Sequence, residues 1–156
     1  MGSRIGFIGV GQMGAPMAER LVAAGHAVAV FDVSAAAMQP LVARGAIAAG
    51  SVREAAAGAE IVFACLPSPE VSKSVALGPD GIAGVDGLGV YVETSTIGTA
   101  AIKAIAGGLG ARGIAVLDAP VSGGPRGARA GKLATMVAGD RAAFEVQHPG
   151  LLLEPV

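Results

Sequence analysis

The stretch Gly9-Val10-Gly11-Gln12-Met13-Gly14 decides the fold of this chain. It is a G-x-G-x-x-G motif that follows a run predicting a β-strand and opens a segment predicting a helix. Each glycine has a mechanical task in such a motif: Gly9 makes a tight turn, Gly11 lets a pyrophosphate approach the backbone, and Gly14 lets the helix pack against the strand. Because the chain has 25 glycines, the position of the motif carries the inference. It favours a dinucleotide-binding turn over a glycine-rich turn without a ligand.

Short runs rich in Val and Ile alternate with Ala-rich segments along the chain, a pattern typical of strand–helix–strand units. Most runs are apolar at odd and even positions, as expected for parallel strands covered on both faces. We therefore expect an α/β fold of the Rossmann type, a doubly wound and mostly parallel sheet. A length of 156 residues predicts one dinucleotide-binding domain, residues 1–156. The expected strands are residues 4–9, 27–32, 46–49, 60–65, 89–93, 114–118 and 133–138.

Several polar residues indicate where helices begin. Ser51 and Glu54 form a capping-box pattern, in which the Ser51 hydroxyl accepts from the Glu54 N–H and the Glu54 carboxylate reaches back. Ser34 is the expected N-cap of an earlier helix, which Pro40 is expected to kink or split. Asp140 is the expected N-cap of a last short helix.

Asp32 ends the expected strand 27–32, 18 residues after Gly14. A carboxylate at this place can accept hydrogen bonds from the adenosine ribose hydroxyls. Its charge repels a 2′-phosphate, and the residues that follow, Val33 and Ser34, offer no arginine to that phosphate. The pattern favours NAD over NADP as the cofactor; the alternative for Asp32 is a plain strand-end turn residue.

Three loops follow later strands at the sheet edge where open α/β proteins bind ligands. Two prolines stiffen the first, Leu66-Pro67-Ser68-Pro69. Hydroxyls of the second, Glu93-Thr94-Ser95-Thr96, can reach a ribose or nicotinamide, or cap the next helix. The third, residues 118–124, ends in Ser122, Gly123 and Gly124. It is either a cradle for a small carboxylate or a bare turn.

Composition argues against several other classes of protein. Mean hydropathy is +0.63, but the longest stretch without Asp, Glu, Lys or Arg, Ile5 to Ala18, has 14 residues and four glycines. That is shorter than the ~18 apolar residues of a membrane helix, so we expect no membrane association. The net charge is −1, from 11 Lys and Arg against 12 Asp and Glu, and the basic residues are scattered along the sequence, which predicts no nucleic-acid partner.

The cysteine and histidine content points to an intracellular protein without a metal centre. Cys65, the single cysteine, lies in an apolar run and is interpreted as a small core residue. It fits a reducing compartment, and the start of the chain has no secretion or lipidation pattern, so we expect a cytoplasmic location. His26 and His148 lack the spacing of metal ligands, and no G-x-S-x-G motif indicates hydrolysis.

Taken in order, these motifs resemble those of the β-hydroxyacid dehydrogenase family, typified by 3-hydroxyisobutyrate dehydrogenase and tartronate semialdehyde reductase. Residues 5–18 resemble its cofactor signature, residues 65–69 its second cofactor loop, and residues 118–124 its substrate signature. The resemblance covers about residues 4–145. It implies that Ser122, Gly123 and Gly124 hold the carboxylate end of the substrate. It also implies a dinucleotide lined, beside the motif glycines Gly9, Gly11 and Gly14, by Gln12, Met13, Phe31, Asp32, Leu66, Pro67 and Thr96.

One feature of that family has no counterpart in these 156 residues. The family carries its catalytic lysine on a helix at the junction with an all-helical second domain, and no such segment is present in the sequence. Lys73, Lys103 and Lys132 are interpreted as solvated surface residues. We therefore expect no catalytic residue in this chain and negligible activity when it is alone.

The function expected from the resemblance is that of an NAD(H)-binding domain of an oxidoreductase. Such an enzyme transfers a hydride between a nicotinamide cofactor and a small 3-hydroxy acid or semialdehyde. A non-catalytic NAD-binding module or sensor, completed by a partner chain, remains the alternative, as does a reductase of the same broad superfamily that acts on imines or semialdehydes. Because family members pack their helical domains together, a homo-oligomer is also possible.

Overall fold

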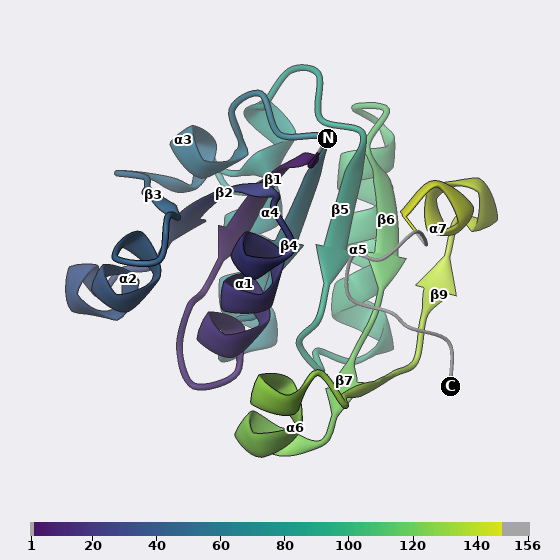
Figure 1. Ribbon diagram of the computed structural model, residues 1–156. Helices are drawn as coiled ribbons and strands as arrows, with labels where there is room; N and C mark the ends of the chain where they lie inside the picture. Colours follow the sequence, from purple (N-terminus) through teal and green to yellow (C-terminus); the bar gives the residue numbers. More distant parts are fainter. Residues whose placement is uncertain (1, 148–156) are drawn as a thin grey trace.

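A seven-stranded sheet between two layers of helices forms the centre of the computed structural model, which describes residues 2–147 (Figure 1). The strand order is β3-β2-β1-β4-β5-β6-β9, parallel except for the antiparallel pair β6 and β9. The order 3-2-1-4-5-6 is that of doubly wound nucleotide-binding sheets, so the predicted fold is confirmed. The strands are β1 (Arg4–Ile8), β2 (Ala27–Phe31), β3 (Ile47–Ala48), β4 (Ile61–Ala64), β5 (Val90–Glu93), β6 (Ala115–Asp118) and β9 (Ala138–Gly139).

The helices cover both faces of this sheet and divide the core into two clusters. One cluster lies under α1 (Gly14–Ala23), α2 (Ala35–Val42), α6 (Gly124–Ala130) and α7 (Arg141–Gln147). The other lies under α3 (Val52–Ala56), α4 (Pro69–Leu77), α5 (Thr99–Gly110) and the short 3-10 helix η1 (Ile82–Gly84). Among the described residues, no helix has both the length and the apolar character needed to cross a membrane.

Small residues let the helices lie close to the sheet. The narrow space between these layers is therefore filled without many aromatic rings. Phe7 of β1 and Phe63 of β4 stack in the first cluster with ring centroids 5.9 Å apart. At Gly6 of β1, an added Cβ would lie 2.6 Å from the backbone oxygen of Ala55. The sheet therefore contacts α3 backbone to backbone, and the apolar stabilisation comes from many small buried side chains.

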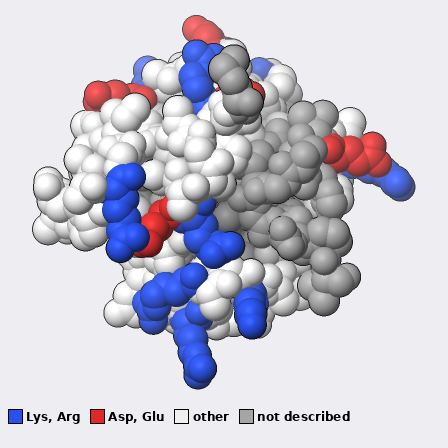
Figure 2. Space-filling view, in the orientation of Figure 1, with Lys and Arg blue, Asp and Glu red and all other residues white. Residues whose placement is uncertain are grey.

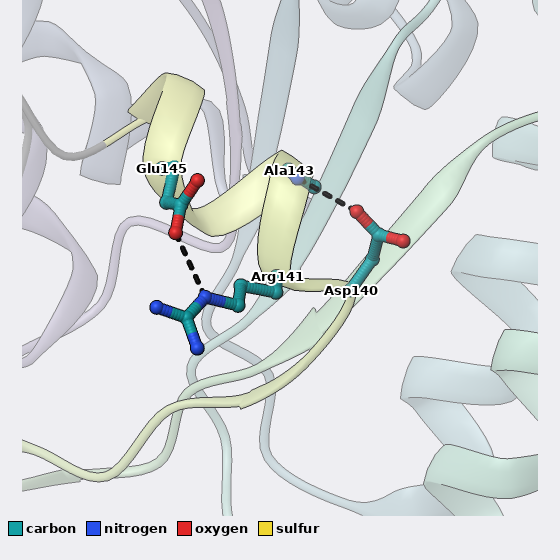
Figure 3. Close-up of polar contacts among 4 residues, drawn as sticks. All are labelled: Asp140, Arg141, Ala143 and Glu145. Carbon is teal, nitrogen blue, oxygen red and sulfur yellow. Dashed lines mark hydrogen bonds and ion pairs between the residues drawn. The ribbon is translucent and has the colours of Figure 1, made fainter.

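Two of the predicted helix starts have the expected cap. The Glu54 N–H donates to the Ser51 hydroxyl at 3.0 Å, but the Glu54 carboxylate accepts from the N–H of Gly50 at 2.7 Å instead of Ser51. The second predicted bond of the capping box, from the Ser51 N–H to the Glu54 carboxylate, is therefore wrong, because the preceding residue is the donor. Asp140 caps α7 by accepting the N–H of Ala143 at 2.7 Å, and Figure 3 shows this bond beside an Arg141–Glu145 ion pair.

The helix after β2 departs from expectation in two ways. Ser34 is the N-cap of α2, but its side chain makes no capping hydrogen bond. Pro40 lies inside α2, which runs unbroken from Ala35 to Val42, so the proline does not split the helix.

The seventh predicted strand, residues 133–138, is wrong as a single element. Its first part is β8 (Ala134–Thr135), which pairs antiparallel with β7 (Val121–Ser122) in a separate two-stranded sheet, and its last part begins β9. At Gly139 (φ +141°), an added Cβ would lie 2.4 Å from the Val116 oxygen. The backbone can therefore approach β6 this closely because residue 139 is a glycine. Between β8 and β9 the chain passes from the two-stranded sheet to the seven-stranded sheet.

Candidate dinucleotide-binding site

The turn between β1 and α1 has no room for side chains at two of its glycines. Gly9 has φ +88°, and an added Cβ would lie 2.1 Å from the backbone oxygen of Cys65. At Gly14 an added Cβ would lie 1.9 Å from the Gly9 oxygen. At Gly11, in contrast, an added Cβ meets no atom within 4 Å. Gly9 and Gly14 therefore serve the turn and the packing of the helix, and Gly11 faces open space.

A cavity of about 600 Å³ opens beside this turn, between the ends of β1, β2 and β4 and the side of α4. This volume lies within the usual range of small-molecule and cofactor pockets, roughly 300 to 1,000 Å³. It adjoins every predicted cofactor residue except Thr96, which is exposed and lies outside it. The lining residues are Ile8, Gly9, Gly11, Gln12, Met13, Gly14, Phe31, Asp32, Val33, Cys65, Leu66, Pro67, Val71 and Val75.

The sequence analysis missed part of the apolar wall of this cavity. Val71 and Val75 lie four residues apart on α4, a spacing that places them on one face of a helix and could have indicated this role. Cys65, interpreted from sequence as a small core residue, is half-buried: it packs against the core and also lies on the cavity wall. Burial raises the pKa of the Cys65 thiol, so the neutral thiol is favoured.

Asp32 holds the glycine-rich turn with its own carboxylate. One oxygen, Oδ2, accepts the N–H of Val10 at 2.9 Å, and the other, Oδ1, accepts the N–H of Ser34 at 2.8 Å. The second bond is the turn contact expected of a strand-end aspartate. The first ties β2 to the loop after β1, so Asp32 does more than end its strand. Each oxygen has a further lone pair, which leaves room for ligand hydroxyl donors.

The loop after β4 is fastened to the loop after β5. The N–H of Leu66 donates to the Ser95 hydroxyl at 2.7 Å, and the Thr94 hydroxyl donates to the Ala64 oxygen at 2.7 Å. Ser95 therefore supports the cavity wall from behind, a role that sequence reasoning did not assign to it. The Ser68 hydroxyl accepts the N–H of Val71 at 3.2 Å and caps α4.

The predicted carboxylate cradle lies at the end of β7, outside the lining of the cavity. Ser122, Gly123 and Gly124 are exposed, and both glycines have positive φ, +136° and +63°. The exposed cations Arg126 and Arg129 belong to α6, which follows directly. Figure 2 shows several Lys and Arg side chains gathered over this part of the face. Basic residues that are scattered along the sequence therefore come together in the folded chain.

The lysines are placed as the sequence analysis expected. Lys73 on α4, Lys103 on α5 and Lys132 after α6 are all exposed, and none of them lines the cavity. Over residues 2–147, the side chains form no group of three or more His, Cys, Asp or Glu that could hold a metal ion.

A doubly wound sheet with a glycine-rich turn and an acidic residue at the end of β2 defines a dinucleotide-binding domain. The chain belongs to the family described as the NAD binding domain of 6-phosphogluconate dehydrogenase, whose model matches residues 4–153. The family match makes NAD the cofactor of this domain.

Individual relatives agree with the family and with the resemblance drawn from the motifs. The chain is 45% identical over 147 residues to an NAD-dependent L-serine dehydrogenase of Pseudomonas aeruginosa, covering 94% of this chain and 49% of the relative. A structure of Mycobacterium tuberculosis 3-hydroxyisobutyrate dehydrogenase with L-serine has a TM-score of 0.91 and 37% identity, covering 97% of this chain and 52% of that one. The chain thus spans about half the length of these relatives.

Not every neighbour uses the same dinucleotide. The structure of Psf3 in complex with NADP+ and 2-OPP has a TM-score of 0.86 and 30% identity, covering 93% of this chain and 52% of that chain. The choice between the two cofactors therefore depends on particular residues and not on the fold.

Proposed function

We propose that this chain is the cofactor-binding half of a dehydrogenase that acts on a small 3-hydroxy acid or semialdehyde. The observation that carries the proposal is the cavity of about 600 Å³, which brings the glycine-rich turn, Asp32 and the Leu66–Pro67 loop together. These segments come from three different parts of the sequence and meet at the carboxyl ends of parallel strands.

The residues around the cavity fit an NAD molecule. Gly11 leaves space where the pyrophosphate approaches, and no side chain caps the N-terminus of α1, which leaves its partial positive charge to the phosphates. Asp32 is placed to accept from the adenosine ribose and to repel a 2′-phosphate, which favours NAD over NADP. When bound, the nicotinamide ring accepts or donates the hydride. The chain itself binds, orients and shields the cofactor.

We assign the substrate's carboxylate to the loop of Ser122, Gly123 and Gly124. The Ser122 hydroxyl and the N–H groups of the two glycines are suitable donors for a carboxylate. Arg126 and Arg129, exposed on the helix that begins in this loop, provide a positive potential that attracts a small anion. L-Serine and 3-hydroxyisobutyrate, named for the relatives, both have the required carboxylate and β-hydroxyl groups.

The proton transfer that accompanies hydride transfer requires a general acid or base within reach of the reacting hydroxyl. The three lysines, Lys73, Lys103 and Lys132, are exposed and outside the cavity lining. We therefore expect the 156-residue chain to bind NAD(H) without turning over L-serine or 3-hydroxyisobutyrate. This arrangement also favours the second candidate function, a non-catalytic NAD-binding module completed by a partner chain.

The first experiment is calorimetric titration of the purified chain with NAD+ and NADP+, followed by an assay of NADH formation with each hydroxy acid. We expect measurable NAD+ binding, weaker NADP+ binding and no turnover. An absence of NAD+ binding to folded protein would refute the proposal. Turnover by this chain alone would refute the expectation that the group transferring the proton lies outside this chain. Binding without turnover, restored by a second polypeptide, would identify that polypeptide as the missing part.

A further inference from the structure

Glu93 is a fully buried carboxylate that neither the cofactor nor the substrate proposal uses. It ends β5, has 0% of its surface exposed, and takes part in none of the ion pairs formed within residues 2–147. A buried carboxylate is costly unless hydrogen-bond donors surround it. Its burial at the end of β5, beside the apolar core, therefore calls for an explanation.

Hydrogen-bond donors from the same strand and the following loop converge on this carboxylate. The Tyr91 hydroxyl donates to Oε2 at 2.9 Å, and the N–H of Ser95 donates to Oε1 at 3.1 Å. The buried Ser72 hydroxyl on α4 lies near enough to favour the charged form, although it does not reach hydrogen-bond geometry. The carboxylate thus fixes the backbone of the β5–α5 loop at Ser95.

The same serine continues the chain of contacts to the cofactor cavity. The Ser95 hydroxyl accepts the N–H of Leu66 at 2.7 Å, and Leu66 together with Pro67 lines the cavity. The order of contacts is therefore Glu93, Ser95, Leu66 and then the ligand space. A shift of the Ser95 backbone moves the hydroxyl that holds Leu66.

We propose that Glu93 is a positioning residue for the cofactor, which sets NAD affinity by holding Ser95 and, through it, the Leu66–Pro67 wall of the cavity. The proposal rests on the NAD-binding function proposed above. It assigns the buried polar cluster at the end of β5 to cofactor affinity and not to fold stability alone. Protonation of Glu93 weakens its bond to Ser95, so affinity is expected to fall on acidification.

Several titratable or charged groups lie on the elements packed around Glu93. Tyr91 lies on the same strand, and Cys65 directly follows the neighbouring strand β4; burial raises the pKa of both. Asp118 is the register partner of Glu93 on β6. The helix α4 presents Ser72, while its charged residues, Glu70 and Lys73, are exposed. The buried residues of α5 are Ala101, Ile105 and Leu109, which carry no charge.

A double-mutant cycle on NAD+ affinity tests the relay. Glu93→Ala removes the acceptor of the Ser95 N–H, and Ser95→Ala removes the acceptor of the Leu66 N–H. We expect each change to weaken NAD+ binding about tenfold, and the double variant to weaken it no further, since both changes break one path. Ser74→Ala, an exposed serine on α4 outside the cavity, is the matched control and is expected to bind as the unmodified chain does.

Two additional readouts separate positioning from general destabilisation. The Leu66 amide is expected to lose protection from hydrogen exchange in both single variants, and the acid-side loss of NAD+ affinity is expected to flatten in Glu93→Gln. If Glu93→Ala does not fold, Glu93→Asp keeps the charge, shortens the reach to the Ser95 N–H and enters the same cycle.

The outcomes distinguish this proposal from the proposed function. If the unmodified chain binds no NAD+, the function itself fails. If it binds NAD+ and the two single variants bind as tightly as the unmodified chain, or if the losses in the two single variants multiply in the double variant, the relay through Ser95 is overturned.

Discussion

The carboxylate of Asp32 and the backbone N–H of Val10 are joined by a 2.9 Å hydrogen bond that ties the end of β2 to the glycine-rich turn after β1. The same side chain lines the cavity in which we place the adenosine ribose. One residue therefore shapes the turn and lines the cavity, and its structural role and its proposed ligand role can be separated by substitution.

We expect Asp32→Asn to retain much of the turn geometry, since the amide oxygen still accepts the Val10 N–H, while the negative charge that repels a 2′-phosphate is lost. The ratio of NADP+ to NAD+ dissociation constants is expected to fall by about tenfold, equivalent to ~1.4 kcal/mol. Asp32→Ala removes both roles and is expected to weaken both cofactors. Calorimetric titration of each variant measures the ratio; an unchanged ratio in Asp32→Asn would contradict the assignment of cofactor choice to this charge.

The glycines of the turn offer a second separation, between packing and ligand approach. In Gly14→Ala the new methyl would lie 1.9 Å from the Gly9 oxygen and 3.2 Å from the Phe7 ring, so α1 must shift. We expect a loss of about 1–3 kcal/mol in the free energy of unfolding, as for other overpacked sites. Urea denaturation followed by circular dichroism measures it.

The matched control for that variant is Gly11→Ala, whose methyl meets no atom within 4 Å. We expect its unfolding free energy to stay within about 0.5 kcal/mol of the unmodified chain. Its NAD+ affinity is nevertheless expected to fall, because the methyl occupies the space of the pyrophosphate. Equal stability losses in the two variants would contradict the distinction between the two glycines.

The sequence predicted the parts of the fold that depend on local pattern. The six parallel strands are short and mostly apolar, and the motif from Gly9 to Gly14 has a mechanical reason for each glycine, so both could be inferred without coordinates. The helix α6 could not be inferred, because its sequence, Gly124 to Ala130, contains a second glycine at position 127 and has little helix propensity. Packing of the fully buried Ala128 into the core decides its conformation.

The site was predictable where a residue stands at a fixed place relative to a local motif, and unpredictable where contacts cross between loops. Asp32 was found because a carboxylate at a strand end beside a glycine-rich turn has few other reasons to be there. Ser95 was expected to reach the ligand or cap a helix, and instead accepts the N–H of Leu66. That bond joins residues 29 positions apart, and no local pattern in either loop indicates it.

Serine caps provide a prediction about stability that is independent of the cofactor. The Ser51 hydroxyl accepts the N–H of Glu54 at the start of α3, so Ser51→Ala is expected to lower the unfolding free energy by about 1 kcal/mol. Ser34 occupies the same N-cap position of α2 but makes no side-chain capping bond, so Ser34→Ala is expected to change stability by less than about 0.5 kcal/mol. Thermal unfolding of the two variants gives the comparison, and a loss in Ser34→Ala equal to that in Ser51→Ala would contradict it.

Burial of Glu93 gives the stability of the chain a specific dependence on pH. Desolvation raises the pKa of this carboxyl in the folded state above its ordinary value of 4.5. At pH values between 4.5 and the pKa of the folded state, the folded state therefore binds more protons than the unfolded state. Stability contributed by Glu93 therefore falls as pH rises from about 4.5 through the folded pKa, and it is constant above that range. Glu93→Gln cannot ionise and loses this contribution to the slope.

The measurement that isolates Glu93 is the difference in unfolding free energy between Glu93→Gln and the unmodified chain, followed from pH 4 to pH 8 by urea denaturation. We expect this difference to shift in favour of Glu93→Gln as pH rises and then to level off. Asp118, whose pKa burial also raises, contributes a slope of the same sign to both proteins, and comparison in an Asp118→Asn background removes it. A difference independent of pH would mean that Glu93 ionises in the folded chain as it does in water, and that the cluster around it compensates fully for its burial.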